Sequence, residues 1–280
     1  MVPGLRIGDP YTGEHPPVPL EGPLDFSDPE TVLLVGRTTC ESLPNDVHSW
    51  FHVSRERGRR WAGPYRFVGL DEGLLLAGRT DVVRLGPRRA LLMLTCHRRD
   101  GHEGRVLCAQ TTDGGRTFGM RSWVGTELTN GFEIMPSTQA LADGRLVCAT
   151  RVVSGGSGHI AVYKSTDSGA TWPCLAPSVA QTGAHGNPPA LASLPDARLA
   201  LVYGYRGAPF GIHAKLSEDG GRSWGEAIAL RTDGGDADLG YPRVAVTSAG
   251  LLVAAYYYNT HTEAERFIAA SVWDTRCEAT

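Results

Sequence analysis

Apolar and polar residues alternate along much of this chain, in short stretches separated by turn-forming residues. Leu199–Tyr205 and Phe267–Trp273 are typical, because both are rich in apolar and aromatic side chains. Alternation with a period of two and this residue content predict β-strands. No stretch approaches the ~18 consecutive apolar residues that a membrane-spanning helix needs. We therefore expect an all-β protein without a membrane segment.

The strands follow a repeating order of three strands, an Asp-containing turn and a fourth strand. The first repeat is expected at Thr31–Gly36 and Trp50–Ser54, and the second at Asp81–Leu85, Ala90–His97 and Arg105–Gln110. The third is expected at Met135–Leu141, Leu146–Arg151, His159–Lys164 and a strand from about Trp172. The fourth is expected at Pro189–Leu194, Leu199–Tyr205 and Gly211–Leu216, and the last at Arg243–Thr247, Leu251–Tyr258 and Phe267–Trp273.

The Asp-containing turns share an eight-residue pattern, Ser/Thr-x-Asp-x-Gly-x-Thr/Ser-aromatic, which we call the octet. It occurs as TTDGGRTF from Thr111, STDSGATW from Ser165 and SEDGGRSW from Ser217, with a weaker copy, SRERGRRW, from Ser54. A regular spacing of about 54 residues indicates one supersecondary unit repeated along the chain.

The chemistry of the octet is that of a tight turn between two strands. Its carboxylate can accept hydrogen bonds from nearby backbone N–H groups, its glycine can take a positive φ, and its aromatic side chain can pack on the sheet. We expect Asp113, Asp167 and Asp219 to be structural. A single carboxylate per turn argues against a metal site, and we expect neither metal nor cofactor.

Repeated four-stranded antiparallel units predict a β-propeller, in which each unit is one blade. Five repeats are counted, and we expect residues 1–280 to form a single domain. The Pro- and Gly-rich residues 1–23 are expected to wrap the surface or complete a sheet. The last repeat has only three strands, so a strand from this N-terminal segment could close its exposed edge.

Composition narrows the possible partners and location. The net charge of −3 gives no basic footprint for nucleic acid. The N-terminus lacks a basic start followed by an apolar run, so we expect a cytoplasmic protein.

The six cysteines form no metal-ligand spacing, and three of them lie in apolar stretches where a free thiol packs as a small hydrophobic group: Cys96, Cys108 and Cys148.

The repeat also predicts which end of the blades carries chemistry. In a four-stranded meander the octets share one edge, and the opposite edge carries the ends of second strands and the starts of first strands. Four second strands end in an arginine: Arg37, Arg98 (after His97), Arg151 and Arg206. Starts of first strands bring Glu133, His185, Asn187, Tyr241 and Arg243 to the same edge. Arginines gathered there would bind a carboxylate or sulfate, so we expect an anionic small molecule or glycan as ligand.

The octets, together with the segment from Asp238 through Tyr256–Asn259 to Arg266–Trp273, resemble the sialidase superfamily of Asp-box or BNR-repeat propellers. The resemblance covers about residues 30–275 and implies a six-bladed propeller. It also implies an arginine cluster that binds a sugar carboxylate, a Tyr–Glu nucleophile pair and an Asp acid/base.

Carried over to this chain, the resemblance makes Tyr241 the nucleophile, Glu133 its base and Arg151 one of the carboxylate ligands. Met135 aligns better than Glu133 by count from Arg151. Asp46 is the candidate acid/base in the loop after Arg37, with Glu41 and His48 as competitors. An arginine expected on Gly211–Ala214 is absent, and Arg206 is the substitute.

Three functions remain open from the sequence. The first is a sialidase-like glycoside hydrolase acting on an anionic or related sugar. The second is a lyase or tailoring enzyme on the same scaffold, in which His185, His97 and Tyr241 act as acid and base. The third is a non-catalytic carbohydrate-binding propeller. The oligomeric state is not predicted.

Overall fold

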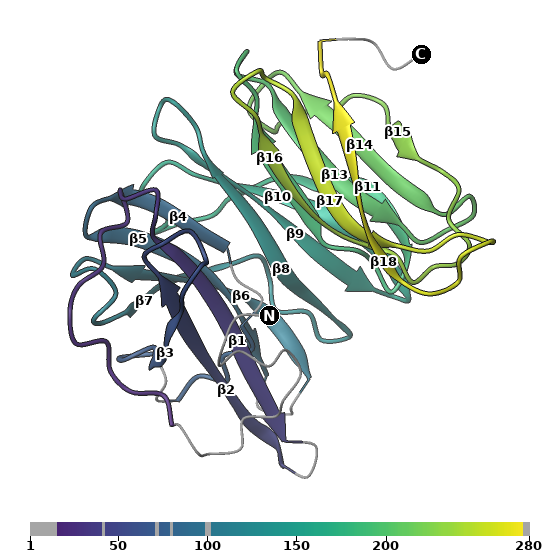
Figure 1. The fold of residues 1–280 in the computed structure, drawn as a ribbon. Helices are drawn as coiled ribbons and strands as arrows, with labels where there is room; N and C mark the ends of the chain where they lie inside the picture. Colours follow the sequence, from purple (N-terminus) through teal and green to yellow (C-terminus); the bar gives the residue numbers. More distant parts are fainter. Residues whose placement is uncertain (1–15, 41–42, 71–72, 79–80, 99–101, 277–280) are drawn as a thin grey trace. The chain divides into compact units, whose positions relative to one another are not determined.

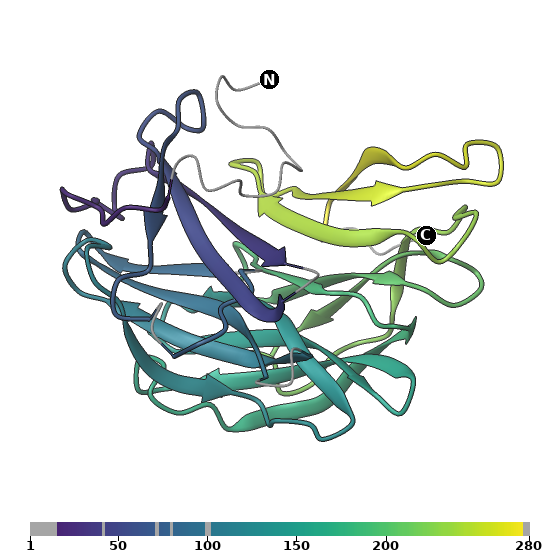
Figure 2. The ribbon, with the colours of Figure 1, turned by 90° about the horizontal axis from the view of Figure 1, so that it is seen from below.

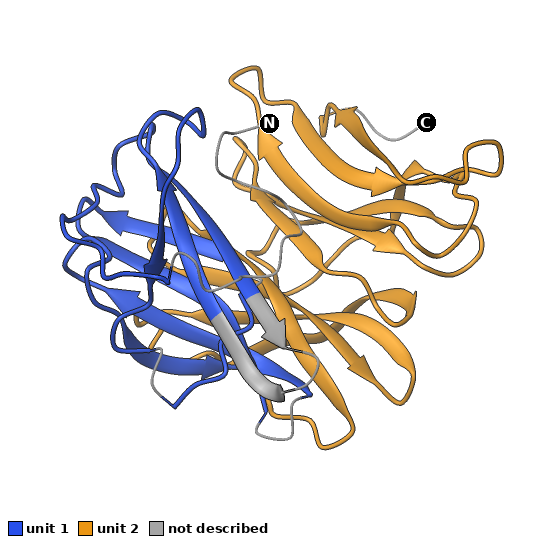
Figure 3. Ribbon diagram, turned by 60° about the horizontal axis from the view of Figure 1, so that its bottom comes forward, with its two compact units in different colours: residues 1–124 blue, residues 125–280 orange. Residues whose placement is uncertain are grey.

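The computed structural model describes residues 16–40, 43–70, 73–78, 81–98 and 102–276, without the side chains of residues 38–40 and 43–48. Every regular element in these ranges is a β-strand (Figure 1). The chain divides into two compact units, residues 1–124 and residues 125–280 (Figure 3). The expectation of a single domain stays a prediction.

Unit 1 contains two antiparallel sheets. The first has the order β1-β2-β3, with β1 (Val32–Cys40), β2 (Leu43–Ser54) and β3 (Ala62–Arg66). The long hairpin of β1 and β2 is drawn in purple in Figure 2. The second has the order β4-β5-β6-β7, with β4 (Asp81–Gly86), β5 (Arg89–His97), β6 (Glu103–Thr111) and β7 (Gly119–Val124).

Unit 2 contains three antiparallel sheets, each a meander of consecutive strands. One consists of β8 (Gly131–Ala140), β9 (Leu146–Ser154), β10 (Ser157–Ser165) and β11 (Cys174–Ala184). The next consists of β12 (Pro189–Ser193), β13 (Leu199–Tyr205), β14 (Gly211–Ser217) and β15 (Ile228–Arg231). The last has β16 (Gly240–Val246), β17 (Leu252–Tyr258) and β18 (Phe267–Trp273).

These five sheets confirm the predicted all-β, β-propeller fold class and the count of five repeats. The bounds of β13 and β18 match the predicted strands, whereas most other strands extend one to four residues further because backbone pairing continues into the turns. Alternating apolar side chains form the cores within each unit. In unit 1, the rings of Phe51, Phe67 and Phe118 pack with centroids 4.9–5.8 Å apart.

The octet turns fold as the sequence predicts. Each lies between the third and fourth strands of its sheet, and in each the aspartate accepts hydrogen bonds from two backbone N–H groups and two hydroxyls. Gly115, Gly169 and Gly221 have φ values of 82°, 83° and 91°. The weaker copy lacks the aspartate but keeps the bond from Gly58 N to Ser54 Oγ at 2.8 Å.

One detail, the position of Asp46, differs from expectation. Asp46 was expected in a loop, but its backbone belongs to β2, because the β1–β2 hairpin pairs well beyond Arg37. The described part of the N-terminal segment joins the first sheet, where Val18 forms a parallel bridge with Tyr65, and residues 1–15 lie outside the described residues. Cys96, Cys108 and Cys148 are free and buried as predicted, whereas Cys174 is free and exposed.

Candidate functional site

The side chain of Arg151, near the end of β9, joins residues from two sheets of unit 2 and from the segment between β11 and β12. Its Nε and Nη2 donate to the carbonyl oxygen of His185, in the segment before β12. Its Nη1 lies 3.3 Å from Sδ of Met135 on β8 and 3.3 Å from the hydroxyl of Tyr241 on β16. Arg151 is 6% exposed, so these contacts hold a largely buried cation at a fixed position.

The three partners of Arg151 share an unusual backbone conformation. Met135, His185 and Tyr241 have φ values of 53°, 62° and 51°, although none is glycine. A left-handed conformation is unfavourable for residues of this kind, and such strain is often retained at functional sites. The convergence of three such residues on one guanidinium group marks this cluster as the candidate site.

Arg206, which follows β13, lies beside the same tyrosine. Its guanidinium carbon is 5.7 Å from the centroid of the Tyr241 ring, and its Nη2 lies 2.9 Å from the hydroxyl of Tyr257. Nε and Nη2 also contact the carbonyl oxygen of Leu239 at 3.3 Å. Within the described residues its hydrogen bonds use Nε and Nη2, which leaves Nη1 available for a ligand.

Asn187 holds the start of β16 in place. Its Nδ2 donates to the carbonyl oxygen of Leu239 at 2.8 Å, and its Oδ1 accepts from the backbone N–H groups of Gly204 and Tyr241 at 3.3 and 3.1 Å. A Cβ at Gly240 would lie 2.3 Å from Nδ2, so only glycine fits there. Asn187 is 0% exposed, so it positions Tyr241 and does not itself present a surface to ligand.

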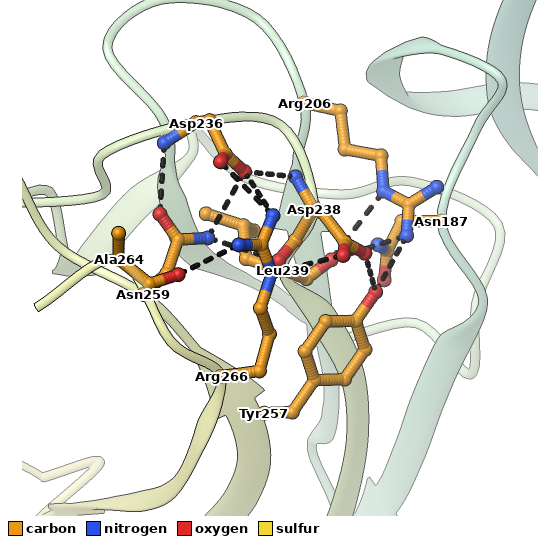
Figure 4. A network of polar contacts seen from close by, with 9 residues as sticks. All are labelled: Asn187, Arg206, Asp236, Asp238, Leu239, Tyr257, Asn259, Ala264 and Arg266. Carbon is orange, nitrogen blue, oxygen red and sulfur yellow. Dashed lines mark hydrogen bonds and ion pairs between the residues drawn. The ribbon is translucent and has the colours of Figure 1, made fainter.

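A polar network also fixes residues 236–239, which come directly before β16 (Figure 4). Arg266 forms ion pairs with Asp236 and Asp238, both at 2.9 Å, and Asn259 Nδ2 donates to the carbonyl oxygen of Asp238 at 2.9 Å. Asp238 also accepts a hydrogen bond from the hydroxyl of Tyr257 at 2.8 Å. The segment that leads into β16 and Tyr241 is therefore anchored by residues on and between the neighbouring strands β17 and β18.

Two guanidinium groups, those of Arg151 and Arg206, lie beside Tyr241. Burial lowers the pKa of the Arg151 guanidinium, and the nearby Tyr241 hydroxyl opposes that shift. Arg206 adds a second positive charge close enough to lower the pKa of Arg151 further. Burial and the hydrogen bond to Asp238 raise the pKa of Tyr257 to about 12, so this second tyrosine stays protonated at neutral pH.

Glu133, the expected base for Tyr241, bonds to residues outside the Arg151 cluster. It is 2% exposed, its Oε1 accepts from Thr150 Oγ1 at 2.6 Å and its Oε2 accepts from the backbone N–H of Thr126 at 3.3 Å. Burial and this carboxylate, which also bonds to the Tyr163 hydroxyl, raise the pKa of Tyr163 above its usual range. Met135, which the residue count favoured, lies with its Sδ 3.3 Å from Nη1 of Arg151, and the ring of Phe132 on the same strand lies 5.2 Å from the Arg151 guanidinium carbon.

The remaining predicted residues divide between the units. In unit 1, Nη1 of Arg37 lies 3.3 Å from Nε2 of His97, and Arg98 follows at the end of β5. The side chain of Asp46 lies outside the described residues. In unit 2, the His185 side chain is exposed, and Arg243 is exposed two residues after Tyr241 on β16.

Sequence reasoning placed Arg151, Arg206, His185 and Tyr241 at one edge, and in the structure these four residues lie together in unit 2. It missed the supporting residues, which are Tyr257, Asp236, Asn259 and Leu239. Tyr257 could have been found from the sequence, because it lies in a run of three tyrosines on β17. The role of the Leu239 backbone carbonyl could not, because the sequence does not show which backbone groups accept hydrogen bonds. Among the described residues no group of His, Cys, Asp and Glu side chains could hold a metal ion.

A family model described as a BNR repeat-like domain matches residues 12–253. The chain belongs to this family. No curated protein sequence matches it. In the part of this BNR repeat-like protein that the structure describes, no helix is long and apolar enough to cross a membrane.

Solved structures share the fold at low sequence identity. A protein of unknown function from Dyadobacter fermentans DSM 18053 is 22% identical, with a TM-score of 0.69 over 91% of this chain and 75% of its own. The Hadza microbial sialidase Hz136 is 16% identical, with a TM-score of 0.63 over 92% of this chain and 56% of its own. An α-L-arabinofuranosidase from Fusarium graminearum is 15% identical, with a TM-score of 0.57 over 92% of this chain and 85% of its own. The BNR repeat-like chain thus has a fold that known glycosidases also have, and it spans little more than half of the sialidase.

Proposed function

We propose that this protein is a glycoside hydrolase that acts on a sugar carrying an anionic group, with Tyr241 as the reacting side chain. The observation that carries the proposal is the 3.3 Å contact between the Tyr241 hydroxyl and Nη1 of Arg151. A neutral phenol is a poor nucleophile, and a guanidinium group beside its oxygen can orient that oxygen and stabilise the charge it carries once its proton has left.

The anionic group of the sugar would bind to Arg206. This side chain is partly exposed, lies over the Tyr241 ring and keeps Nη1 available, so a carboxylate could reach it directly. Arg243, exposed on the same strand as Tyr241, is a second candidate for this contact. Arg151 acts on Tyr241 itself, because its N–H groups are largely occupied by His185, Met135 and Tyr241.

In hydrolysis, the Tyr241 oxygen would attack the anomeric carbon, the bond to the leaving oxygen would break, and water would then release the sugar. The Tyr241 proton needs an acceptor. Glu133, whose Oε1 bonds to Thr150, and the exposed imidazole of His185 are the two candidates. Arg37, His97, Arg98 and Asp46 remain proposals for substrate binding and leaving-group protonation.

A second candidate is elimination on a uronate. It is favoured because Glu133 bonds to Thr150, while Met135 is the residue that contacts Nη1 of Arg151 next to Tyr241. An eliminating enzyme needs no Tyr–Glu pair: a base removes the proton next to the carboxylate, a carbon–carbon double bond forms, and the leaving oxygen takes a proton from an acid. Tyr241 and His185 would supply the base and the acid.

One experiment separates these functions. Wild-type protein is incubated with aryl sialosides, aryl uronides and uronate-containing oligosaccharides, and both aryl alcohol release and the ultraviolet absorbance of unsaturated products are followed. Release of aryl alcohol without absorbance supports hydrolysis, and unsaturated product supports elimination. Binding of these sugars without either product would mean a non-catalytic carbohydrate-binding protein and would overturn both proposals.

A further inference from the structure

A second concave site lies in unit 2, apart from the Arg151 cluster. It is a groove with a volume of about 460 Å³ between β11 and the sheet of β13 and β14. Its walls include Gln181 from β11, Tyr203 and Tyr205 from β13, and His213 and Lys215 from β14. The volume is within the range of small-molecule sites, and none of these five side chains takes part in the Arg151 cluster.

Three aromatic rings form one wall of the groove. The His213 ring stacks on Tyr203 with centroids 5.9 Å apart and 28° between the planes, and it lies 5.5 Å from the ring of Tyr205. Tyr203 is 3% exposed, whereas Tyr205 is partly exposed. Stacked aromatic rings with polar edges offer a flat apolar surface together with hydrogen-bonding groups.

Two polar side chains of the groove, His213 and Gln181, have hydrogen-bonding groups without a partner among the described residues. Nε2 of His213 is buried and has no hydrogen-bond partner within the described part of the chain, which is unusual for a buried polar atom. The Gln181 amide accepts from Ser157 Oγ at 3.3 Å and donates to Ser178 Oγ at 3.2 Å, so one of its N–H groups is left for a ligand.

The charge in the groove is small. Burial lowers the pKa of His213, so this imidazole is neutral at neutral pH. Lys215 is the one charged side chain among the described residues that line the groove, and its Nζ already donates to the carbonyl oxygen of Gly225 at 3.0 Å. None of these lining residues is a carboxylate that could bind a cationic ligand.

We propose that this groove binds a neutral sugar unit. The C–H face of a pyranose or furanose ring would lie against Tyr205, and its hydroxyl groups would bond to Nε2 of His213 and the amide of Gln181. This site is distinct from the anion-binding cluster around Tyr241 and does not rest on the proposed catalytic function.

The test is titration of the full chain with neutral methyl glycosides and disaccharides of glucose, galactose, mannose, xylose and arabinose. Binding is followed by calorimetry and by the histidine ring resonances in NMR spectra. We expect at least one of these sugars to bind with a millimolar Kd and to shift the His213 resonance. Tyr205→Ala and Gln181→Ala should each weaken that binding at least about tenfold.

Tyr241→Phe serves as the control, because it alters the other site and should leave neutral-sugar binding within about twofold. Gln181 is exposed, so Gln181→Ala tests the groove even if Tyr205→Ala does not fold. The proposal is overturned if none of the neutral sugars binds, if adenosine binds where the sugars do not, or if binding is lost in Tyr241→Phe and kept in Gln181→Ala.

Discussion

The hydroxyl of Tyr241 and Nη1 of Arg151 lie 3.3 Å apart, although 90 residues separate them in the chain. The contact joins the end of β9 to the start of β16, and Met135 and His185 complete it from β8 and the segment before β12. Because all three hydrogen-bond partners of Arg151 have positive φ, their conformations depend on the surrounding hydrogen bonds. The cluster is therefore preorganised, as a catalytic or binding site requires.

Replacing Arg206 with alanine should weaken the binding of anionic sugars. Loss of a charge-assisted hydrogen bond should raise KM for an aryl uronide or sialoside about 10- to 100-fold, with a smaller effect on kcat. Kinetics on a matched pair of acidic and neutral aryl glycosides measure this. Arg145→Ala is the control, because Arg145 pairs with Asp143 at the opposite edge of its sheet. An equal loss on both substrates would refute the role of Arg206.

Asn187→Ala should affect both stability and turnover. Three backbone groups would lose their buried partner, so the free energy of unfolding should fall by about 2–3 kcal/mol. Because the N–H of Tyr241 is one of these groups, kcat should fall more than KM rises. Thermal unfolding and steady-state kinetics report the two effects, and exposed Asn130→Ala should change neither. Wild-type kcat in Asn187→Ala would show that Tyr241 does not need this support.

Glu133→Gln should retain most of the turnover. The carboxylate of Glu133 bonds to Thr150 and Tyr163, and an amide can preserve part of this bonding. Glu133→Ala should lower the melting temperature, since it leaves the buried hydroxyl of Thr150 without its partner. If Glu133→Gln abolishes turnover while its melting temperature is unchanged, Glu133 is the base for Tyr241 after all.

The octet turns should lose stability in acid. Hydrogen bonds from Ser223 and neighbouring groups lower the pKa of Asp219 from 3.8 to about 2. A depressed folded-state pKa stabilises the fold fully above pH 3.8, and this contribution disappears as the pH falls towards 2. At pH 7, Asp219→Asn should lower Tm by about 2–4 °C. The Tm difference from wild type should shrink below pH 4, and a constant difference across that range would contradict the assignment.

The repeat made most of the fold predictable from the sequence. Octets fix the third-to-fourth turn of a sheet, and counting from them places Arg151 and Arg206 at second-strand ends. The same counting favoured Met135, whereas the resemblance favoured Glu133, and the sequence does not reveal that β8 has an irregular register between Ile134 and Ser137. Alternation alone puts both residues on one face, whereas in the structure Met135 has a φ of 53° and contacts Arg151.

The supporting network was beyond sequence reasoning for a different reason. Asn187 looked like a ligand-binding residue because it lies at the start of a first strand. Its amide instead bonds to backbone groups of residues 204, 239 and 241. A pattern of side chains in the sequence does not predict hydrogen bonds to distant backbone groups.

The most direct test of the account is turnover by Tyr241→Phe, which removes one oxygen and keeps the ring beside Arg206. On whichever anionic glycoside the wild-type protein cleaves, kcat should fall at least about 100-fold while Kd for the substrate changes less than about threefold. The Tyr257→Phe variant should lose far less. Full activity in Tyr241→Phe would contradict the central claim that the Tyr241 hydroxyl, held by Arg151, is the reacting group.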